Sequence, residues 1–305
     1  MISKHSKVVD YSIVLLLTFI WGFSWPVTIV GLRHCDPILL GSLRCILGGL
    51  GLWLWRLRSP KKEHYDAQAI QVAVIVGLLW VGIPMALTIW GLQYISGGLG
   101  SILQSTVPFF IAILAHFYLK ENQLNIIRII GLLLGFAGVL VLFSDDSFST
   151  ESRNVLLGGL AILFSSVTIG MAQVYARKHF KGHDQIGFGM WMQITAGLIV
   201  LPFSWISGVP KFEVTIEMLL ALGYLGFIGS ALAFTLYFDL LQRVDIVALS
   251  MMAYIIPIVA VIAGIIWLGE SMSMIDIAGS VLIMAGVVVA TQYQLIKSKL
   301  IKRST

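Results

Sequence analysis

The sequence predicts an all-α membrane protein with ten transmembrane helices, arranged as two inverted five-helix repeats. Composition, the length of the apolar runs and an internal repeat carry this prediction. Of 305 residues, 58% are hydrophobic and 11% are charged, and the mean hydropathy is +0.93. A water-facing surface needs about a quarter of the residues charged. Lipid must therefore act as the solvent, which restricts the fold to helices or a closed barrel.

The length of the apolar runs decides between these two. A barrel strand alternates apolar and polar residues over about ten positions, whereas these runs are unbroken for about twenty, the length of a spanning helix. The run from Ser12 to Leu32 lacks a small-residue cleavage site and is interpreted as a retained first span, not a signal peptide. The predicted helices cover approximately residues 12–32, 38–56, 68–91, 95–118, 126–143, 155–176, 185–206, 216–239, 246–268 and 274–293.

Charge orients these helices. With the N-terminus in the cytoplasm, sixteen of the twenty Lys and Arg residues fall on the inner side. Arg33, Arg153 and Lys211 fall outside, and Arg44 lies within the second span. Basic residues gather on the cytoplasmic side of membrane proteins. We therefore expect both termini in the cytoplasm and, for a bacterial chain, a location in the inner (plasma) membrane. The basic excess fits contact with the lipid bilayer and gives no reason to expect a nucleic acid partner.

The chain repeats itself after five helices. A shift of 149 residues superimposes seven identical positions, which include Pro108 on Pro257 and Glu121 on Glu270. A shift of 148 places Asp36 on Asp184 and matches several glycines. This divides the chain into residues 1–145 and 146–305. Five is an odd number of crossings, so the second copy runs through the membrane in the opposite sense, the recurrent plan of secondary transporters.

With this repeat, the sequence resembles the EamA-type, ten-helix members of the drug/metabolite transporter superfamily. The matching runs are FIWGFSWPVTIVGLRHCDPILLGSLRCILGGL (19–50), GLQYISGGLGSILQSTVPFFIAILAHFYLKE (91–121), GLLLGFAGVLVLF (131–143), LQRVDIVALSMMAYIIPIVAVIAGIIWLGE (241–270) and GSVLIMAGVVVATQ (279–292). The resemblance implies an exporter or exchanger whose cavity lies between helices 1–4 and 6–9, with helices 5 and 10 behind it. Small multidrug relatives carry a proton-coupling glutamate in their first helix. No acid occurs in residues 12–32 here, so that mechanism does not carry over.

Polar and aromatic stripes along the apolar runs supply candidate substrate-binding residues. Polar groups at membrane depth face another helix or a wet cavity, so interhelical hydrogen bonding is the alternative for each of them. Tryptophans at span ends fit the interfacial belt instead, which assigns Trp53, Trp55, Trp205 and Trp267 to it. The predicted substrate-binding residues are Trp21, Trp25, Arg44, Trp80, Ser101, Gln104, Ser105, Gln173, Trp191, Tyr237 and Tyr254.

Pro108 and Pro257 occupy matching places in the two repeats and are predicted to be paired hinges, since proline removes a helical hydrogen bond. Arg44 has two interpretations. It either snorkels to the outer interface or binds a solute carboxylate through its planar fork. The matching residue of the second repeat is Met192, so the repeated scaffold does not require a cation there.

These observations predict a secondary transporter that exports small organic metabolites, such as neutral or aromatic amino acids, by alternating access. Multidrug efflux is the alternative within that class; an intramembrane enzyme and a non-transporting receptor are the alternatives outside it. No catalytic or metal-binding motif occurs, so no enzymatic activity and no cofactor are expected. A GxxxG pair at Gly131 and Gly135 leaves both a monomer and a homodimer open.

Overall fold

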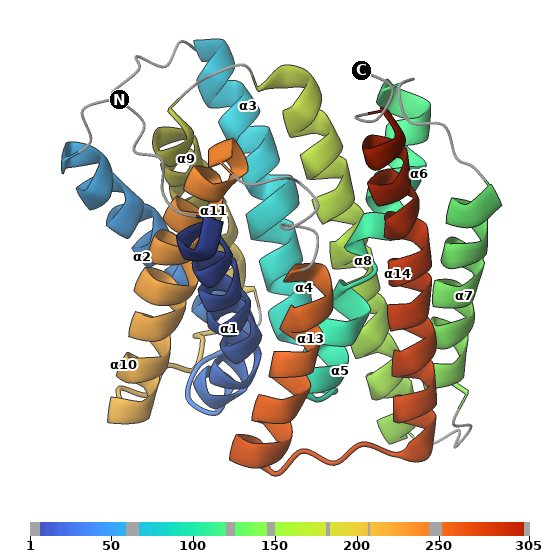
Figure 1. The fold of residues 1–305 in the computed structure, drawn as a ribbon. Coiled ribbons are helices and arrows are strands. Elements are labelled where there is room, and N and C mark those ends of the chain that lie inside the picture. The colour runs from blue at the N-terminus through green and yellow to red at the C-terminus, as the bar shows by residue number, and fades with distance from the viewer. Residues whose placement is uncertain are drawn as a thin grey trace.

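The computed structural model describes residues 7–58, 67–119, 126–144, 150–180, 184–206, 208–243 and 252–301. Within these ranges the regular elements are all helical, apart from one isolated bridge between Cys35 and Phe212. Figure 1 shows them as a bundle of roughly upright helices. The elements are α1 (Lys7–Leu32), α2 (Pro37–Arg58), α3 (Ala67–Gly77), η1 (Leu78–Gly82), α4 (Ile83–Gly91), α5 (Gly97–Gln104), α6 (Val107–Leu119), α7 (Ile126–Leu142), α8 (Thr150–His179), α9 (Gln185–Val200), η2 (Leu201–Trp205), α10 (Ile216–Gly223), η3 (Tyr224–Leu232), α11 (Ala233–Arg243), α13 (Met252–Ala263), η4 (Gly264–Leu268) and α14 (Met274–Ile301).

Seven helical segments in the described chain are long and apolar enough to cross a membrane. Three shorter apolar helices accompany them, at Ile126–Leu142, Met252–Leu268 and Met274–Ala290. The chain is therefore an all-α, multi-pass membrane protein. Each of these segments overlaps a run predicted from the sequence. Residues 246–251 of the predicted ninth span, with Ser250 among them, lie outside the described residues, as does Glu121.

The helices extend further than the apolar runs that predicted them. α1 begins at Lys7 instead of residue 12, α8 covers Thr150–His179, and α14 reaches Ile301. Hydropathy detects only the part of a helix that lies in hydrocarbon, whereas the backbone hydrogen bonds continue into the polar interface. The first turn of α1 and the last turn of α14 lie at the same end of the bundle (Figure 1).

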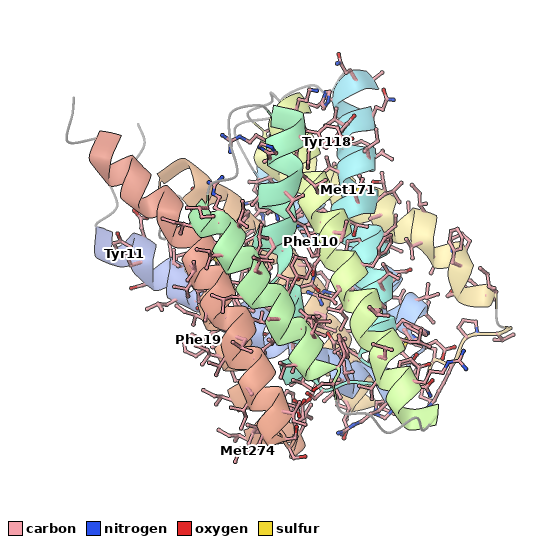
Figure 2. All side chains as sticks on the ribbon, turned by 90° about the vertical axis from the view of Figure 1, so that its right-hand side faces the viewer. Tyr11, Phe19, Phe110, Tyr118, Met171 and Met274 are labelled. Atoms are coloured by element: carbon pink, nitrogen blue, oxygen red, sulfur yellow. The ribbon has the colours of Figure 1, made fainter. Side chains whose placement is uncertain are left out.

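The outer surface of the bundle is apolar. Figure 2 shows Tyr11, Phe19, Tyr118, Met171 and Met274 standing on it, and their exposure ranges from 43% for Met171 to 83% for Met274. Trp53, Trp55, Trp205 and Trp267 are also about half exposed. Large apolar side chains in such numbers fit contact with lipid.

Glycines set the closest helix contacts. α7 packs along α14, and a Cβ atom on Gly131 would lie 2.7 Å from the carbonyl oxygen of Gly286. Gly138 faces Gly279 in the same way, at 2.6 Å from its carbonyl oxygen. Small residues of this kind let two helices approach closely in lipid. The GxxxG face of α7 is thus used within the chain.

Several helices are interrupted within the bundle. η1 and η3 are π-helical stretches inside continuous helical segments, and η4 is a π-helical stretch that ends the segment begun by α13. Such stretches are rare and often accompany functional sites. Between α5 and α6 the helix breaks at Ser105 and Thr106, immediately before Pro108, whereas Pro257 stays inside α13. The two prolines, expected to act as a pair, therefore have different local structures.

Loops at each end join distant parts of the chain. At one end Asp36 accepts a hydrogen bond from the Lys211 backbone nitrogen at 2.8 Å, and His34 lies 3.0 Å from Glu213 and 3.1 Å from Glu217. At the other end Asp184 caps α9 through the backbone nitrogen of Gly187 and pairs with Arg56 at 2.8 Å. Asp36 and Asp184, which match in the sequence repeat, thus both bind polar groups at the ends of the bundle.

Candidate functional site

Arg44 lies inside the bundle on α2, seven residues from the first residue of that helix, or about 10 Å along its axis. Its Nε donates a hydrogen bond to Ser230 Oγ at 3.3 Å. Ser230 is buried in η3 and donates in turn to the Leu225 carbonyl at 2.9 Å. Arg44 thus extends toward another helix instead of toward the outer interface. Among the described residues no carboxylate forms an ion pair with it.

Aromatic side chains lie beside this arginine. Trp21 donates its indole N–H to the Gly229 carbonyl at 3.2 Å, one residue before Ser230. The Trp21 ring contacts Tyr237, with ring centroids 5.5 Å apart, and Phe234, at 6.0 Å. Trp21, Arg44 and Tyr237, all predicted from the sequence, are therefore brought together by α1, α2 and the η3–α11 segment.

A glutamine absent from the predicted set joins them. Gln193 on α9 is only 2% exposed, and among the described residues neither atom of its amide group has a hydrogen-bond partner. It lies against Gly48, where an added Cβ atom would be 3.3 Å from Gln193 Nε2 and 2.7 Å from Ser230 Cβ. Only glycine permits this approach. Gly48 is one helical turn beyond Arg44 on the same face. We call Trp21, Arg44, Gln193, Ser230 and Tyr237 the Arg44 cluster.

A second set of polar side chains, all of them uncharged, lies between α4, α5 and α8. Thr88 of α4 donates to Gln104 Oε1 at 3.0 Å, and Gln104 Nε2 donates to Ser165 Oγ of α8 at 3.1 Å. Thr88 Oγ1 and Ser165 Oγ are also 3.0 Å apart. These residues, the Gln104 cluster, connect three segments through their own hydrogen bonds.

Four other predicted residues lie at helix contacts. Trp25 packs against Gly100 of α5, where an added Cβ atom would lie 2.9 Å from its ring, and Ser101 donates to the Gly98 carbonyl of its own helix at 2.7 Å. Ser105 lies 3.9 Å from the Met284 sulfur, and Tyr254 donates to the Val287 carbonyl at 3.4 Å. Ser105 and Tyr254 thus point to α14, which fits a packing role.

Trp80 and Trp191 gather in a different place. Both are half-buried and pack against an apolar cluster formed by α3, α8, α9 and neighbouring residues. The fully buried Met192 belongs to this cluster. Arg44 and Met192, which match in the repeat, therefore occupy chemically opposite surroundings. Gln173 is half-buried on α8, one residue after the buried Ala172 of the same cluster.

The sequence pattern could have identified Gln193, but not Ser165. Gln193 is the only amide in the apolar run 186–206, and the reasoning that selected Gln104 applies to it equally. Ser165 and its neighbour Ser166 both donate to the Ile162 carbonyl of their own helix, at 2.7 and 3.1 Å. Ser165 also contacts Thr88 and Gln104. A one-residue difference in helical phase separates the two serines, and only the packed structure resolves it.

Two other features are separate from these clusters. A groove of about 400 Å³ lies between α2 and the η3–α11 segment and includes Gly51, Trp55, Arg58, Phe227 and Thr235; no member of the Arg44 cluster lines it. Within the described ranges no three His, Cys, Asp or Glu residues are grouped so as to hold a metal ion.

The known proteins that resemble this chain include two named as transporters and one named as an efflux pump. The chain is 28% identical to the uncharacterized transporter YoaV of Bacillus subtilis over 279 residues, covering 91% of this chain and 95% of YoaV. It is 25% identical to the uncharacterized inner membrane transporter YedA of Escherichia coli, covering 93% and 91% of the two chains. A probable amino-acid metabolite efflux pump of Salmonella typhimurium is 25% identical, with 91% and 93% covered.

The fold has a solved counterpart. One crystal structure superimposes with a TM-score of 0.63 over 94% of this chain and 98% of the other, at 18% identity. At this identity the likeness concerns the fold alone. The model of the EamA-like transporter family matches the sequence twice, at residues 10–144 and 156–292. Together these two matches cover most of the chain, one in each half, and the chain belongs to the EamA-like transporter family.

Proposed function

We propose that this membrane transporter is a secondary transporter with ten spans in two inverted repeats, working by alternating access. The seven long and three shorter apolar helices add up to ten candidate spans. Helix contacts recur between the halves: α1 packs on α13 as α8 packs on α6, and α4 packs on α8 as α10, η3 and α11 pack on α1. π-helical stretches recur in the third and eighth predicted spans. Two halves of matching packing can exchange conformations and open to either side in turn.

The proposed orientation places both termini in the cytoplasm of a bacterial inner membrane. It rests on the distribution of Lys and Arg. Cysteine labelling tests it: Cys35 and Cys45 are replaced, and single cysteines are introduced at Ser149, Lys181 and Ser298. Only position 149 should react with an impermeant thiol reagent added to intact cells. Reaction at 181 or 298 would reverse the proposed orientation.

The proposed cargo is a small solute with a carboxylate and an apolar body, with neutral or aromatic amino acids as the first choice. The observation that carries this is Arg44, a cation inside the bundle whose only described partner is the neutral Ser230. A charge at membrane depth without a counter-charge costs about 3 kcal/mol, and a carboxylate supplies the missing partner in a two-pronged geometry. Trp21 and Tyr237 beside it offer apolar surface for the remainder of the solute.

Export is the proposed direction. The name of the Salmonella relative, a probable amino-acid metabolite efflux pump, supports both export and the amino-acid class. Residues 12–32 contain no acid, so the proposal includes weak or absent proton coupling.

Transport in liposomes tests the proposal. Purified protein is reconstituted with and without a pH gradient and assayed with labelled phenylalanine, methionine and phenethylamine. We expect transport of the two amino acids, and we expect Arg44→Met, which copies the second repeat, to lose it. Equal transport of acids and amines by this variant would remove Arg44 from the site. No transport of any amino acid, with transport of bulky cations instead, would establish multidrug efflux in its place.

A further inference from the structure

Gln193 is the least satisfied polar side chain in the described part of the protein. Its amide is the only buried side-chain group there with two atoms that lack a hydrogen-bond partner. Leaving a buried polar group unpaired costs about 1–3 kcal/mol, and buried polar groups are paired in the great majority of proteins. A methionine or leucine would fill the same space without this cost. The amide therefore needs a hydrogen-bond partner that the described protein groups do not provide.

The position of Gln193 indicates which partner this is. Gln193 Nε2 and Ser230 Cβ lie 3.3 and 2.7 Å from the same point, the Cβ position of Gly48. The sum of these distances, 6.0 Å, is an upper limit for their separation. Ser230 Oγ is the atom to which Arg44 Nε donates. The Gln193 amide on α9 and the Arg44 guanidinium on α2, which has no described counter-charge, thus both lie next to Ser230.

The two groups differ in what they can recognise. A guanidinium only donates, so Arg44 binds acceptor groups on the solute, a carboxylate above all, and cannot bind its ammonium group. An amide both donates through Nε2 and accepts through Oε1. A carboxylate has about four acceptor sites and an Arg fork uses two, which leaves room for the amide donor. An α-ammonium group beside that carboxylate would supply the donor that Oε1 lacks.

We infer that Gln193 is the specificity-determining residue that distinguishes α-amino acids from simple carboxylic acids. This rests on the proposed function, because it takes Arg44 as the carboxylate-binding group. Arg44 provides most of the attraction. Gln193 donates a hydrogen bond to the carboxylate through Nε2 and accepts one from the ammonium group through Oε1. Gly48 is the small residue that lets this amide reach the site.

Ligand-induced thermal stabilisation of the purified full chain tests the inference. The probes are L-phenylalanine and 3-phenylpropanoate, which share the ring and the carboxylate and differ in the ammonium group. The wild type should bind phenylalanine about tenfold more tightly, the scale of one hydrogen bond to a charged group. Gln193→Met should bind both probes alike. It should also be at least as stable as the wild type without solute, because it removes an unpaired amide.

The matched control is Thr195→Val on the same helix, where the hydroxyl donates to the Trp191 carbonyl of its own turn. It should keep the wild-type preference. An unchanged preference in Gln193→Met, or a clear loss of its solute-free stability, would overturn the inference while leaving the proposed function intact. If the wild type binds 3-phenylpropanoate and phenylalanine equally well, only the inference fails. If neither probe binds the wild type, the carboxylate site at Arg44 fails, and the inference fails with it.

Discussion

The Gln104 and Arg44 clusters both connect helices from the two halves of the chain, but their hydrogen-bonding states are opposite. In the Gln104 cluster each of the three side chains bonds to the other two. In the Arg44 cluster a cation donates to a neutral hydroxyl, and the Gln193 amide has no hydrogen-bond partner in the described part of the chain. Polar side chains at membrane depth thus have two uses. A set with its hydrogen bonds complete holds helices together, and we propose that the set with incomplete hydrogen bonds binds the solute.

The largest effect is expected from a variant that gives Arg44 a counter-charge within the protein. Ser230→Asp places a carboxylate beside Arg44, and the resulting charge-assisted pair competes with the solute. We expect transport of carboxylate solutes in liposomes to fall at least tenfold, with the protein still folded in detergent.

Ser230→Asn, which has the same shape without the charge, separates charge from bulk and should lose much less. Wild-type transport by Ser230→Asp would mean that the solute carboxylate binds elsewhere.

The converse change damages the saturated cluster. Gln104→Leu leaves the Thr88 and Ser165 hydroxyls with one partner fewer, and the free energy of unfolding should fall by about 1–3 kcal/mol. Transport per folded molecule should fall far less than in Ser230→Asp. Thermal unfolding and transport normalised to folded protein measure the two effects.

The triple variant Thr88→Val, Gln104→Leu, Ser165→Ala sharpens this result. Removing all partners together avoids stranded polar groups, so it should recover part of the lost stability. A selective loss of transport in Gln104→Leu at unchanged stability would instead return Gln104 to the solute site.

The smallest expected effect concerns a second cation, one that has acidic partners. Hydrogen bonds that His34 donates to the Glu213 and Glu217 carboxylates raise the pKa of His34 above 6.5. Hydrogen bonds that Glu213 accepts from His34 and Lys211 lower the pKa of Glu213 below 4.5. The His34 contribution to stability is therefore complete below pH 6.5 and is lost as the pH rises through the raised pKa. The Glu213 contribution is lost as the pH falls through its lowered pKa.

His34→Gln should lower stability slightly between these limits and not above them, as expected for an exposed ion pair. Thermal unfolding from pH 4 to 9 measures this. An equal difference at every pH would show that the imidazole acts by shape and not by charge.

Much of the fold could be predicted from the sequence. Charge content and twenty-residue apolar runs required spanning helices because an unsatisfied backbone is excluded from lipid. The runs that predicted spans at residues 38–56 and 216–239, for example, are helical in the structure. Helix ends were less predictable, since α8 and α14 continue beyond their apolar runs.

The candidate site could be predicted only in part. Trp21, Arg44 and Tyr237, all predicted to bind substrate, lie close together in the structure. Ser105 and Tyr254 instead contact α14, and Trp80 and Trp191 pack against an apolar cluster. All of them are polar or aromatic residues at membrane depth. Their partners lie on helices more than a hundred residues away in most cases, and periodicity within one helix carries no information about them.

The sequence by itself determined the medium, the helices and the family, because these follow from local composition, the length of apolar runs and motifs in fixed order. Only the tertiary structure decided which polar groups are satisfied. Gln104 and Gln193 are the same residue type in similar apolar runs. Gln104 has Thr88 and Ser165 within hydrogen-bond distance, whereas Gln193 has a glycine beside it and no partner among the residues that the structure describes. A hydrogen bond depends on distances between helices, which are set when the helices pack.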